Sequence, residues 1–219
     1  MKDVQSRNQG FHRIWALLLF LFGAGCFYNL DLERPVPLRV DPKDHQPVAL
    51  IPISDAKGFP SSGSKILSAA RNFLQNRGYR LVDSAEVSQR LKPYPGPPSS
   101  LFSNADFVRD FAAQVQAKLL LIGSLAEYRL GKSYVGTQTE QVWQGGLFDY
   151  RMLPTYHWEH SRIRLIFKLV DSETGKIVWM AEGVLQGPSV SPDSLSEKLV
   201  EGLLEDLPTI PSGGSSEEK

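Results

Sequence analysis

The amino-acid sequence predicts an α/β (α+β) domain built on a mixed five-stranded sheet, with about four helices on its faces. Between residues 48 and 128, short apolar runs of strand length alternate with amphipathic segments, which indicates strands joined by helical crossovers. Two later runs, 162–170 and 176–185, alternate apolar with polar residues on either side of a short turn, as β-hairpins do. Because crossovers are right-handed, we expect three parallel strands, to which the hairpin adds two antiparallel ones.

The first two predicted strands flank an amphipathic helix. Residues 48–53 are a short apolar run, in which Pro52 indicates a strand end or a sheet edge. The helix over 64–77 places its apolar residues at helical spacing on one face. Gly78 follows the helix where the left-handed conformation is favoured, and residues 79–82 form the second strand.

Two shorter helices and a longer strand come next. Asp83 has the position of a cap for a short helix that runs through Leu91, and Asn104 caps a helix over the residues that follow it. Residues 118–128 are the best candidate for the central strand, because their first half is apolar on both faces.

The hairpin and a final helix complete the domain. Gly175 provides a positive φ in the hairpin turn, and Trp179 lies on the apolar face of the second hairpin strand. Ser191 followed by Pro192 is a strong helix start, and Pro208 ends that helix.

Residues 129–158 are the least predictable part of the chain and are rich in aromatic residues. One interpretation is core packing with an ordered loop; the other is an exposed surface for a partner subunit or for the membrane interface. A membrane-spanning strand needs about 9–11 residues of clean alternation, and residues 132–143 are too polar and irregular for that. The residues of the candidate partner surface are Tyr134, Trp143, Phe148, Tyr150, Tyr156 and Trp158.

The chain begins with the features of a secretory signal. Basic residues precede an apolar run over 14–22, and three small residues lead directly into Cys26, the only cysteine. This arrangement resembles the lipobox of bacterial lipoproteins, which implies attachment of a diacylglyceryl group to the Cys26 thiol and cleavage after residue 25. The alternatives are an ordinary signal peptide and an uncleaved anchor, although the apolar run has about half of the ~20 residues that span a bilayer.

The predicted organisation has four segments: a signal peptide over 1–25, Cys26 with a tether to residue 47, one periplasmic domain over 48–208 and a disordered tail over 209–219. Prolines in 27–47 favour an extended tether, which would span about 65 Å as polyproline II. The alternative for this segment is an edge strand, since Val36, Leu38 and Val40 alternate with other residues.

The charge of the chain indicates no nucleic-acid binding. Basic and acidic residues number 24 each, and removal of residues 1–25 takes away three basic residues and one acidic residue, which leaves a net charge of −2. Nucleic-acid binding requires a concentrated basic face.

Two motifs resemble a phosphate-binding loop and a metal site, but neither has the residue pattern that such a site requires. Residues 58–65 resemble a phosphate-binding loop in outline, but Ser64 and Lys65 are transposed and Pro60 removes one backbone N–H. His157 and His160 are a closely spaced pair, but this spacing places them on opposite faces of a strand. We therefore expect no catalytic residues, no metal, no cofactor and no enzyme activity.

A second resemblance rests on motifs spread over residues 48–205. They are the run 48–53, Gly-Tyr-Arg-Leu-Val-Asp at 78–83, Ala-Lys-Leu-Leu-Leu-Ile-Gly-Ser-Leu at 117–125 and Lys-Leu-Val-Asp-Ser-Glu-Thr-Gly-Lys-Ile-Val-Trp at 168–179. Together with the lipobox, this series resembles the bacterial lipoprotein superfamily of the curli-secretion channel (CsgG) and the penicillin-binding-protein activator (LpoB). The resemblance implies a periplasmic domain held at the outer membrane, and Phe27 in place of an aspartate fits that membrane.

The expected function is that of a lipid-anchored accessory or assembly factor in envelope biogenesis or export. It would act by protein–protein contact, with an envelope protein or a second copy of the chain as partner. One alternative is the activator of a peptidoglycan synthase, which needs a tether long enough to cross the peptidoglycan. A component of an oligomeric secretion channel and an envelope hydrolase are the others.

Overall fold

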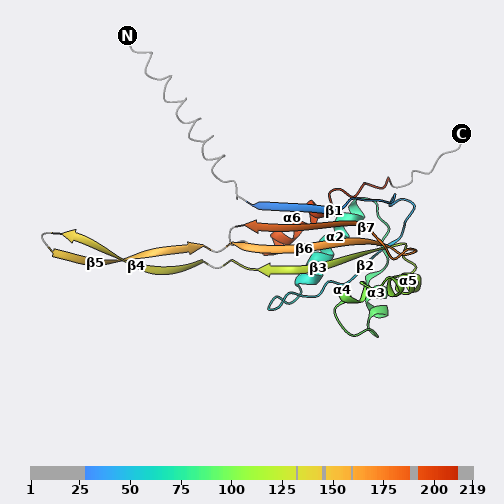
Figure 1. Ribbon diagram of the computed structural model, residues 1–219, viewed down its shortest axis with the longest axis horizontal. Coiled ribbons are helices and arrows are strands. Elements are labelled where there is room, and N and C mark those ends of the chain that lie inside the picture. The colour runs from blue at the N-terminus through green and yellow to red at the C-terminus, as the bar shows by residue number, and fades with distance from the viewer. Residues whose placement is uncertain (1–27, 132, 145–146, 159, 188–191, 212–219) are drawn as a thin grey trace, which may run out of the picture.

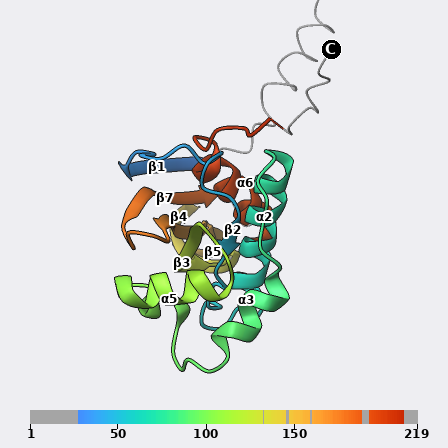
Figure 2. The same cartoon turned by 90° about the vertical axis from the view of Figure 1, so that its right-hand side faces the viewer.

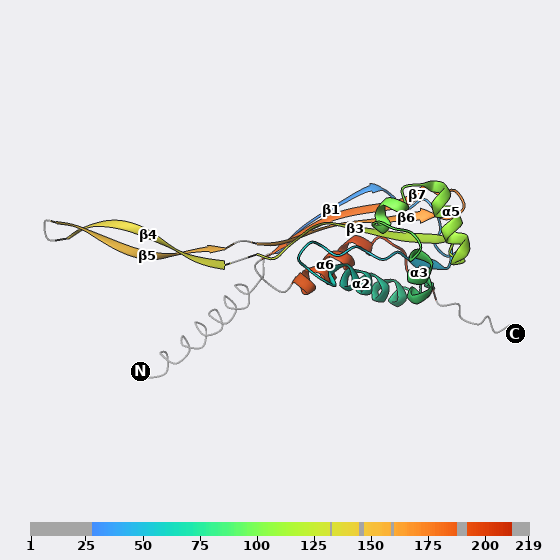
Figure 3. The same cartoon turned by 90° about the horizontal axis from the view of Figure 1, so that it is seen from below.

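A computed structural model of the chain describes residues 28–131, 133–144, 147–158, 160–187 and 192–211 (Figure 1). Its elements form a packed body, from one end of which a two-stranded ribbon projects (Figures 1 and 3). In chain order the elements are β1 (Asn29–Val36), β2 (Val48–Leu50), α2 (Ser62–Asn76), α3 (Ser84–Leu91), α4 (Pro98–Leu101), α5 (Ala105–Gln114), β3 (Leu119–Arg129), β4 (Ser133–Gln144), β5 (Leu147–Trp158), β6 (Ser161–Asp171), β7 (Ile177–Gly187) and α6 (Pro192–Leu204).

The body contains a mixed five-stranded sheet in the order β1-β7-β6-β3-β2. The only parallel pair in it is β2 with β3, so the prediction of three parallel strands is wrong. Residues 79–82 do lie beside β2 in the parallel direction, with a single bridge between Val48 and Leu81. Left-handed Gly78 (φ 82°) precedes this segment and Asp83, the cap of α3, follows it, so the chain turns away from β2 after this one bridge and forms no ladder.

The long strand and the hairpin follow the sequence pattern. Residues 119–122 of β3 are buried, as a strand covered on both faces requires. β3 lies between β6 and β2, however, so the central position belongs to β6. β6 and β7 form the expected antiparallel hairpin, and Gly175 in its turn has φ 67°.

Helices cover the sheet unequally. α2 and α6 lie side by side along one face, and Leu165, Phe167 and Trp179 of the sheet are buried there (Figures 2 and 3). α3, α4 and α5 gather at the end away from the ribbon and cover a second apolar cluster, which includes Ile51 and Leu120 (Figure 1).

The predicted caps are confirmed at two helices. The Asp83 carboxylate accepts a hydrogen bond from the Ala85 N–H at 3.1 Å, and the Asn104 side-chain oxygen accepts one from the Asp106 N–H at 2.9 Å. Helix α6 begins at Pro192 as predicted, whereas its expected cap, Ser191, lies outside the described residues.

The segment before residue 48 is part of the body, which corrects our preference for a tether over 27–47. Residues 29–36 form β1, an edge strand that pairs antiparallel with β7 over Asn29–Glu33 and again at Val36. The register shifts between Glu33 and Val36, and this irregularity contains Pro35, which has no N–H to give to a ladder.

The C-terminal end of the described chain also packs on the body. The Ile210 N–H donates to the Arg77 carbonyl at 2.7 Å, and the Arg77 guanidinium donates to the carbonyls of Glu205, at 2.8 Å, and Leu207. A Cβ on Gly78 would lie 2.1 Å from the Ile210 carbonyl oxygen. Residues 209–210, which we expected in the tail, therefore contact the domain.

Candidate functional site: a projecting ribbon

The most distinctive feature of the molecule is the ribbon of β4 and β5, which extends past the end of the sheet (Figures 1 and 3). The two strands pair antiparallel from Ser133 with Trp158 to Gln144 with Leu147. Each strand has 12 residues, so the ribbon is about 40 Å long at ~3.4 Å per residue. This ribbon contains all six residues that the sequence predicts as a partner surface.

The ribbon continues the central strand pair of the body in the same register. The last pair of β3 and β6 joins Arg129 to Arg162, and four residues further along both strands Ser133 is paired with Trp158. β3 therefore leads into β4, and β5 leads into β6, as one long hairpin. The position of every ribbon residue is thus set by the register of the sheet.

Contacts at the junction fix the direction in which the ribbon leaves the body. The Gly131 N–H donates to the buried Ser161 hydroxyl at 2.9 Å. The Glu127 carboxylate and the Arg162 guanidinium form an ion pair at 3.2 Å. The Tyr128 ring lies edge-on to the Phe59 ring, with 5.0 Å between centroids.

The pairing divides the ribbon residues between two faces, because residues alternate along a strand and cross-strand partners share a face. One face carries no charged residue and is called the aromatic face below; the other carries Glu140, Asp149 and Arg151. The aromatic face holds Ser133, Val135, Thr137, Thr139, Gln141, Trp143, Phe148, Tyr150, Met152, Pro154, Tyr156 and Trp158.

Five of the six predicted partner-surface residues are therefore on one face, and Tyr134 is on the other. The sequence analysis treated the six as one set and did not identify the register that separates them. A signal for it was present: Gly145-Gly146 between two runs of strand-forming residues is typical of a two-residue hairpin loop.

The amino-terminal end of β1 lies beside the base of the ribbon. Asn29 is paired with Gln186 on β7, and Gln186 is paired with Arg162 on β6. The Tyr28 ring packs against Gly187, and the Lys198 ammonium lies 3.8 Å from its centroid. Cys26, the predicted lipidation site, lies outside the described residues and precedes Tyr28 by two positions.

The N–H groups at the start of α2 donate hydrogen bonds to the loop that precedes it, so they are not free to bind a phosphate. The Asp55 carboxylate accepts hydrogen bonds from the Ser61 N–H at 2.9 Å and the Gly63 N–H at 2.8 Å. It thereby occupies the position at the helix N-terminus where a bound anion would lie. The structure agrees with our rejection of a phosphate-binding loop over 58–65.

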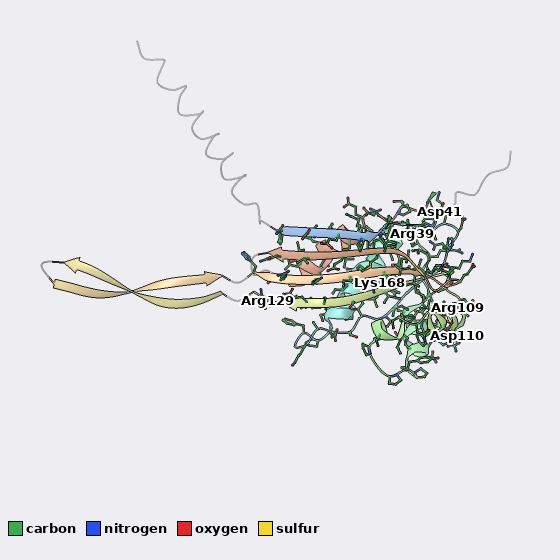
Figure 4. All side chains as sticks on the ribbon, viewed as in Figure 1. Arg39, Asp41, Arg109, Asp110, Arg129 and Lys168 are labelled. Carbon is green, nitrogen blue, oxygen red and sulfur yellow. The ribbon has the colours of Figure 1, made fainter. Side chains whose placement is uncertain are left out.

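The charged residues of the body do not converge on a catalytic centre. Figure 4 shows Arg129 at the ribbon end, Lys168 on the sheet, and Arg109 with Asp110 on α5. A hollow of about 280 Å³ beside Lys168 is otherwise lined by apolar and hydroxyl side chains and by Gly175. Among the described residues, no three histidine, cysteine or acidic residues are grouped as metal ligands.

Tyr79 is the one buried titratable group whose pKa departs clearly from its ordinary value within the described part of the chain. Burial raises the pKa of its hydroxyl to about 12, against the lowering effect of the nearby Arg77 charge. The hydroxyl has no hydrogen-bond partner. It packs in the core beside α2, so its shift reflects burial rather than catalysis.

Of the helices that the structure describes, none combines the length and apolarity needed to cross a membrane.

No family model and no curated protein matches this sequence. Among solved structures, PelC of Paraburkholderia phytofirmans, a dodecamer, is similar at 20% identity over 84% of this chain and 99% of that chain, with a TM-score of 0.47. Lipoprotein GNA1162 of Neisseria meningitidis is similar at 16% identity over 72% of this chain and 94% of that chain, also at 0.47. LpoB of E. coli is similar at 15% identity over 64% of this chain and 56% of that chain, at 0.39. The curli-secretion branch of the resemblance stays a prediction, and these low TM-scores carry no conclusion about function.

Proposed function

We propose that this chain is a lipid-anchored accessory factor on the periplasmic face of the outer membrane, and that it acts by protein contact rather than by catalysis. The observation that supports it most directly is the ribbon. Its 24 paired residues extend beyond the body, and an isolated two-stranded hairpin is only marginally stable in water. A ribbon of this length is best explained as an element that contacts another surface.

We favour this proposal over the alternative of a peptidoglycan synthase activator, because the connection between Cys26 and the body is short. That function needs a tether long enough to cross the peptidoglycan, and the resemblance implies a longer linker than residues 27–47 for such activators. Because β1 begins at Asn29 and Tyr28 packs on the body, only Phe27 separates Cys26 from a packed residue. The two Cα–Cα steps from Cys26 to Tyr28 reach about 7 Å when fully extended, so a lipid on Cys26 would keep the body beside the membrane.

The attachment is tested by fractionation of a Cys26→Ala variant. We expect the wild-type chain in the membrane fraction and the variant in the soluble periplasmic fraction. A variant that stays in the membrane fraction would contradict the lipid anchor.

The contact function is tested by shortening the ribbon. Replacing residues 136–155 with Asn-Gly keeps the pair Val135 with Tyr156 and closes the hairpin there. Acylated wild-type and shortened proteins are then purified from membranes, and the proteins that accompany each are compared. A partner lost only from the shortened protein supports the proposal, whereas an unchanged set of partners contradicts a role for the ribbon.

A further inference from the structure

We propose that the hollow beside Lys168 binds a small carboxylate that carries an apolar group. The hollow has a volume of about 280 Å³ and lies next to Phe102, which follows α4. This volume is at the lower end of the range for ligand pockets, so it suits a ligand with a short carbon chain rather than a large cofactor. Binding there needs neither the lipid on Cys26 nor the ribbon, and it would be a second function of the body.

The floor of the hollow is the face of the sheet that α2 and α6 do not cover. Because residues alternate between the two faces along a strand, Ile122 of β3 shares this face with Ile166 and Lys168 of β6 (Figure 4). Lys168 is paired with Ile122, and Ser124, the next residue of β3 on this face, is paired with Ile166. Ser124 and Lys168 are therefore diagonal neighbours, close enough for one small group to contact both.

The walls of the hollow are held in place by contacts within the body. Phe102 is buried and packs edge-on to the Phe111 ring of α5, with 5.1 Å between the two centroids. The Asp171 carboxylate accepts hydrogen bonds from the Thr174 N–H at 2.9 Å and from the Thr174 hydroxyl at 2.6 Å, which fixes the hairpin turn that leads to Ile177. A ligand therefore does not have to order these walls, and this lowers the cost of binding.

The ion pairs on this face of the sheet leave Lys168 without a partner. β6 places three cationic residues there, of which Arg162 forms an ion pair with Glu127 at 3.2 Å, and the Arg164 Nε donates to the Glu182 carboxylate at 2.6 Å. The Lys168 ammonium has neither an ion pair nor a hydrogen bond to the described residues, and its neighbours across both adjacent strands are apolar. Because Lys168 is half-buried, an anion beside its ammonium would be screened by water less than at an exposed lysine.

The lining of the hollow determines the class of ligand. The Ser124 hydroxyl also makes no hydrogen bond within the described part of the chain, so this hydroxyl and the Lys168 ammonium offer donors for the two oxygens of a carboxylate. A phosphate dianion would keep uncompensated charge beside a single lysine, since phosphate sites combine several cations or backbone N–H groups. Ile122, Ile166 and Ile177 supply apolar surface next to these donors. An aliphatic carboxylate meets both kinds of surface at once.

Methyl NMR of the isoleucines tests the inference on the whole mature chain, residues 26–219, with Cys26→Ala so that no detergent competes for the hollow. This chain has eight isoleucines, of which the three named above line the hollow and five lie elsewhere. Their δ1-methyl signals are assigned with single Ile→Val variants and are followed while sodium hexanoate is added. We expect saturable shifts at the three lining methyl groups and much smaller ones at the other five.

The controls separate recognition of the charge from apolar contact. Lys168→Gln should weaken hexanoate binding by about tenfold or more, because it removes a charged hydrogen-bond donor. Lys176→Gln is the matched control: Lys176 is an exposed lysine of the same hairpin that does not line the hollow, so its loss should leave the affinity nearly unchanged. Hexanol has the same carbon chain without the charge, and it should bind the wild type as weakly as hexanoate binds Lys168→Gln. The five other methyl signals show that each variant is folded.

N-acetylleucine distinguishes two sources of such a carboxylate. Tighter binding than that of hexanoate identifies the end of a polypeptide chain as the ligand, and weaker binding identifies a free aliphatic acid. Equal affinities for hexanoate and hexanol, or a Lys168→Gln variant that binds hexanoate as the wild type does, overturn recognition of the carboxylate. Shifts that do not saturate, or that are equal at all eight isoleucines, overturn the hollow as a site. None of these results bears on the fractionation of Cys26→Ala or on the shortened ribbon, so this site and the proposed function fail separately.

Discussion

The body and the ribbon share one long hairpin, in which β3 leads into β4 and β5 leads into β6. The two parts of this hairpin are stabilised differently. In the body, β3 and β6 bury Leu121, Leu165 and Phe167 beneath helices α2 and α6. In the ribbon the same pairing continues in register, yet no helix among the described elements packs on it (Figure 3). The body therefore gains its stability from burial beneath helices, and the ribbon has no such cover from the described helices.

The largest expected difference between the two regions is the effect of removing a tryptophan. Trp179→Ala should lower the free energy of unfolding by about 3–5 kcal/mol, because Trp179 is fully buried. Trp143→Ala should lower it by no more than about 0.5 kcal/mol, because the contact proposal places the ribbon residues at the surface. Urea unfolding followed by circular dichroism measures both.

This pair of variants also tests the interpretation of 129–158 as core. If Trp143→Ala is as destabilising as Trp179→Ala, the ribbon residues serve the fold and the contact proposal loses its basis. Matching m-values would show that neither variant alters the denatured state.

A smaller effect is expected from carboxylates. Asp55→Ala removes the acceptor for the Ser61 and Gly63 N–H groups and should destabilise the body by about 1–2 kcal/mol. Asp149→Ala in the ribbon is the matched control, with an expected change within about 0.5 kcal/mol. Thermal melts at neutral pH provide the comparison, and equal losses in the two variants would refute the assignment of Asp55 as an internal cap.

The raised pKa of Tyr79 predicts that the body loses stability at alkaline pH. Its pKa is about 12 in the folded protein, against about 10 in an unfolded chain. The unfolded state therefore loses the phenolic proton first, so the contribution of Tyr79 to stability is full below pH 10 and declines as pH rises toward 12.

Tyr79→Phe removes this titration together with a buried hydroxyl that has no partner. We expect the variant to be at least as stable as the wild type at neutral pH, and to gain on it between pH 10 and 12. Denaturant midpoints measured across that range test this, and a constant difference between the two proteins would contradict it.

Much of the body could be predicted because its signals are local. Asp83 and Asn104 cap their helices through their own side chains, and the β6–β7 hairpin shows alternation on both strands. The prediction of a second strand at 79–82 was wrong for a reason that hydrophobic periodicity does not reveal. A run of this length forms either a strand or a single bridge, and its flanking turn and cap decide between them.

The edge strand was only our second choice for its segment, and the ribbon was missed, because their signals are not local. Pro35 and its neighbours favoured a tether, but an edge strand tolerates proline where its ladder is irregular. In β4 taken alone, threonine, glutamine and glycine obscure the alternation. The aromatic face becomes evident once Trp143 is paired with Phe148 and the register is extended along β5.

The smallest expected change in stability, and the sharpest test of the two faces, comes from two tyrosines of the ribbon. Tyr134 and Tyr156 lie near its base on opposite faces, because Tyr156 is paired with Val135 and Tyr134 with His157. Either alanine variant should keep its free energy of unfolding within about 0.5 kcal/mol of the wild type. Tyr156→Ala should nevertheless weaken the capture of a partner that the ribbon contacts, since Tyr156 belongs to the aromatic face. Tyr134→Ala should leave that capture unchanged, and equal losses in the two variants would show that the partner contact does not depend on which face of the ribbon a residue belongs to.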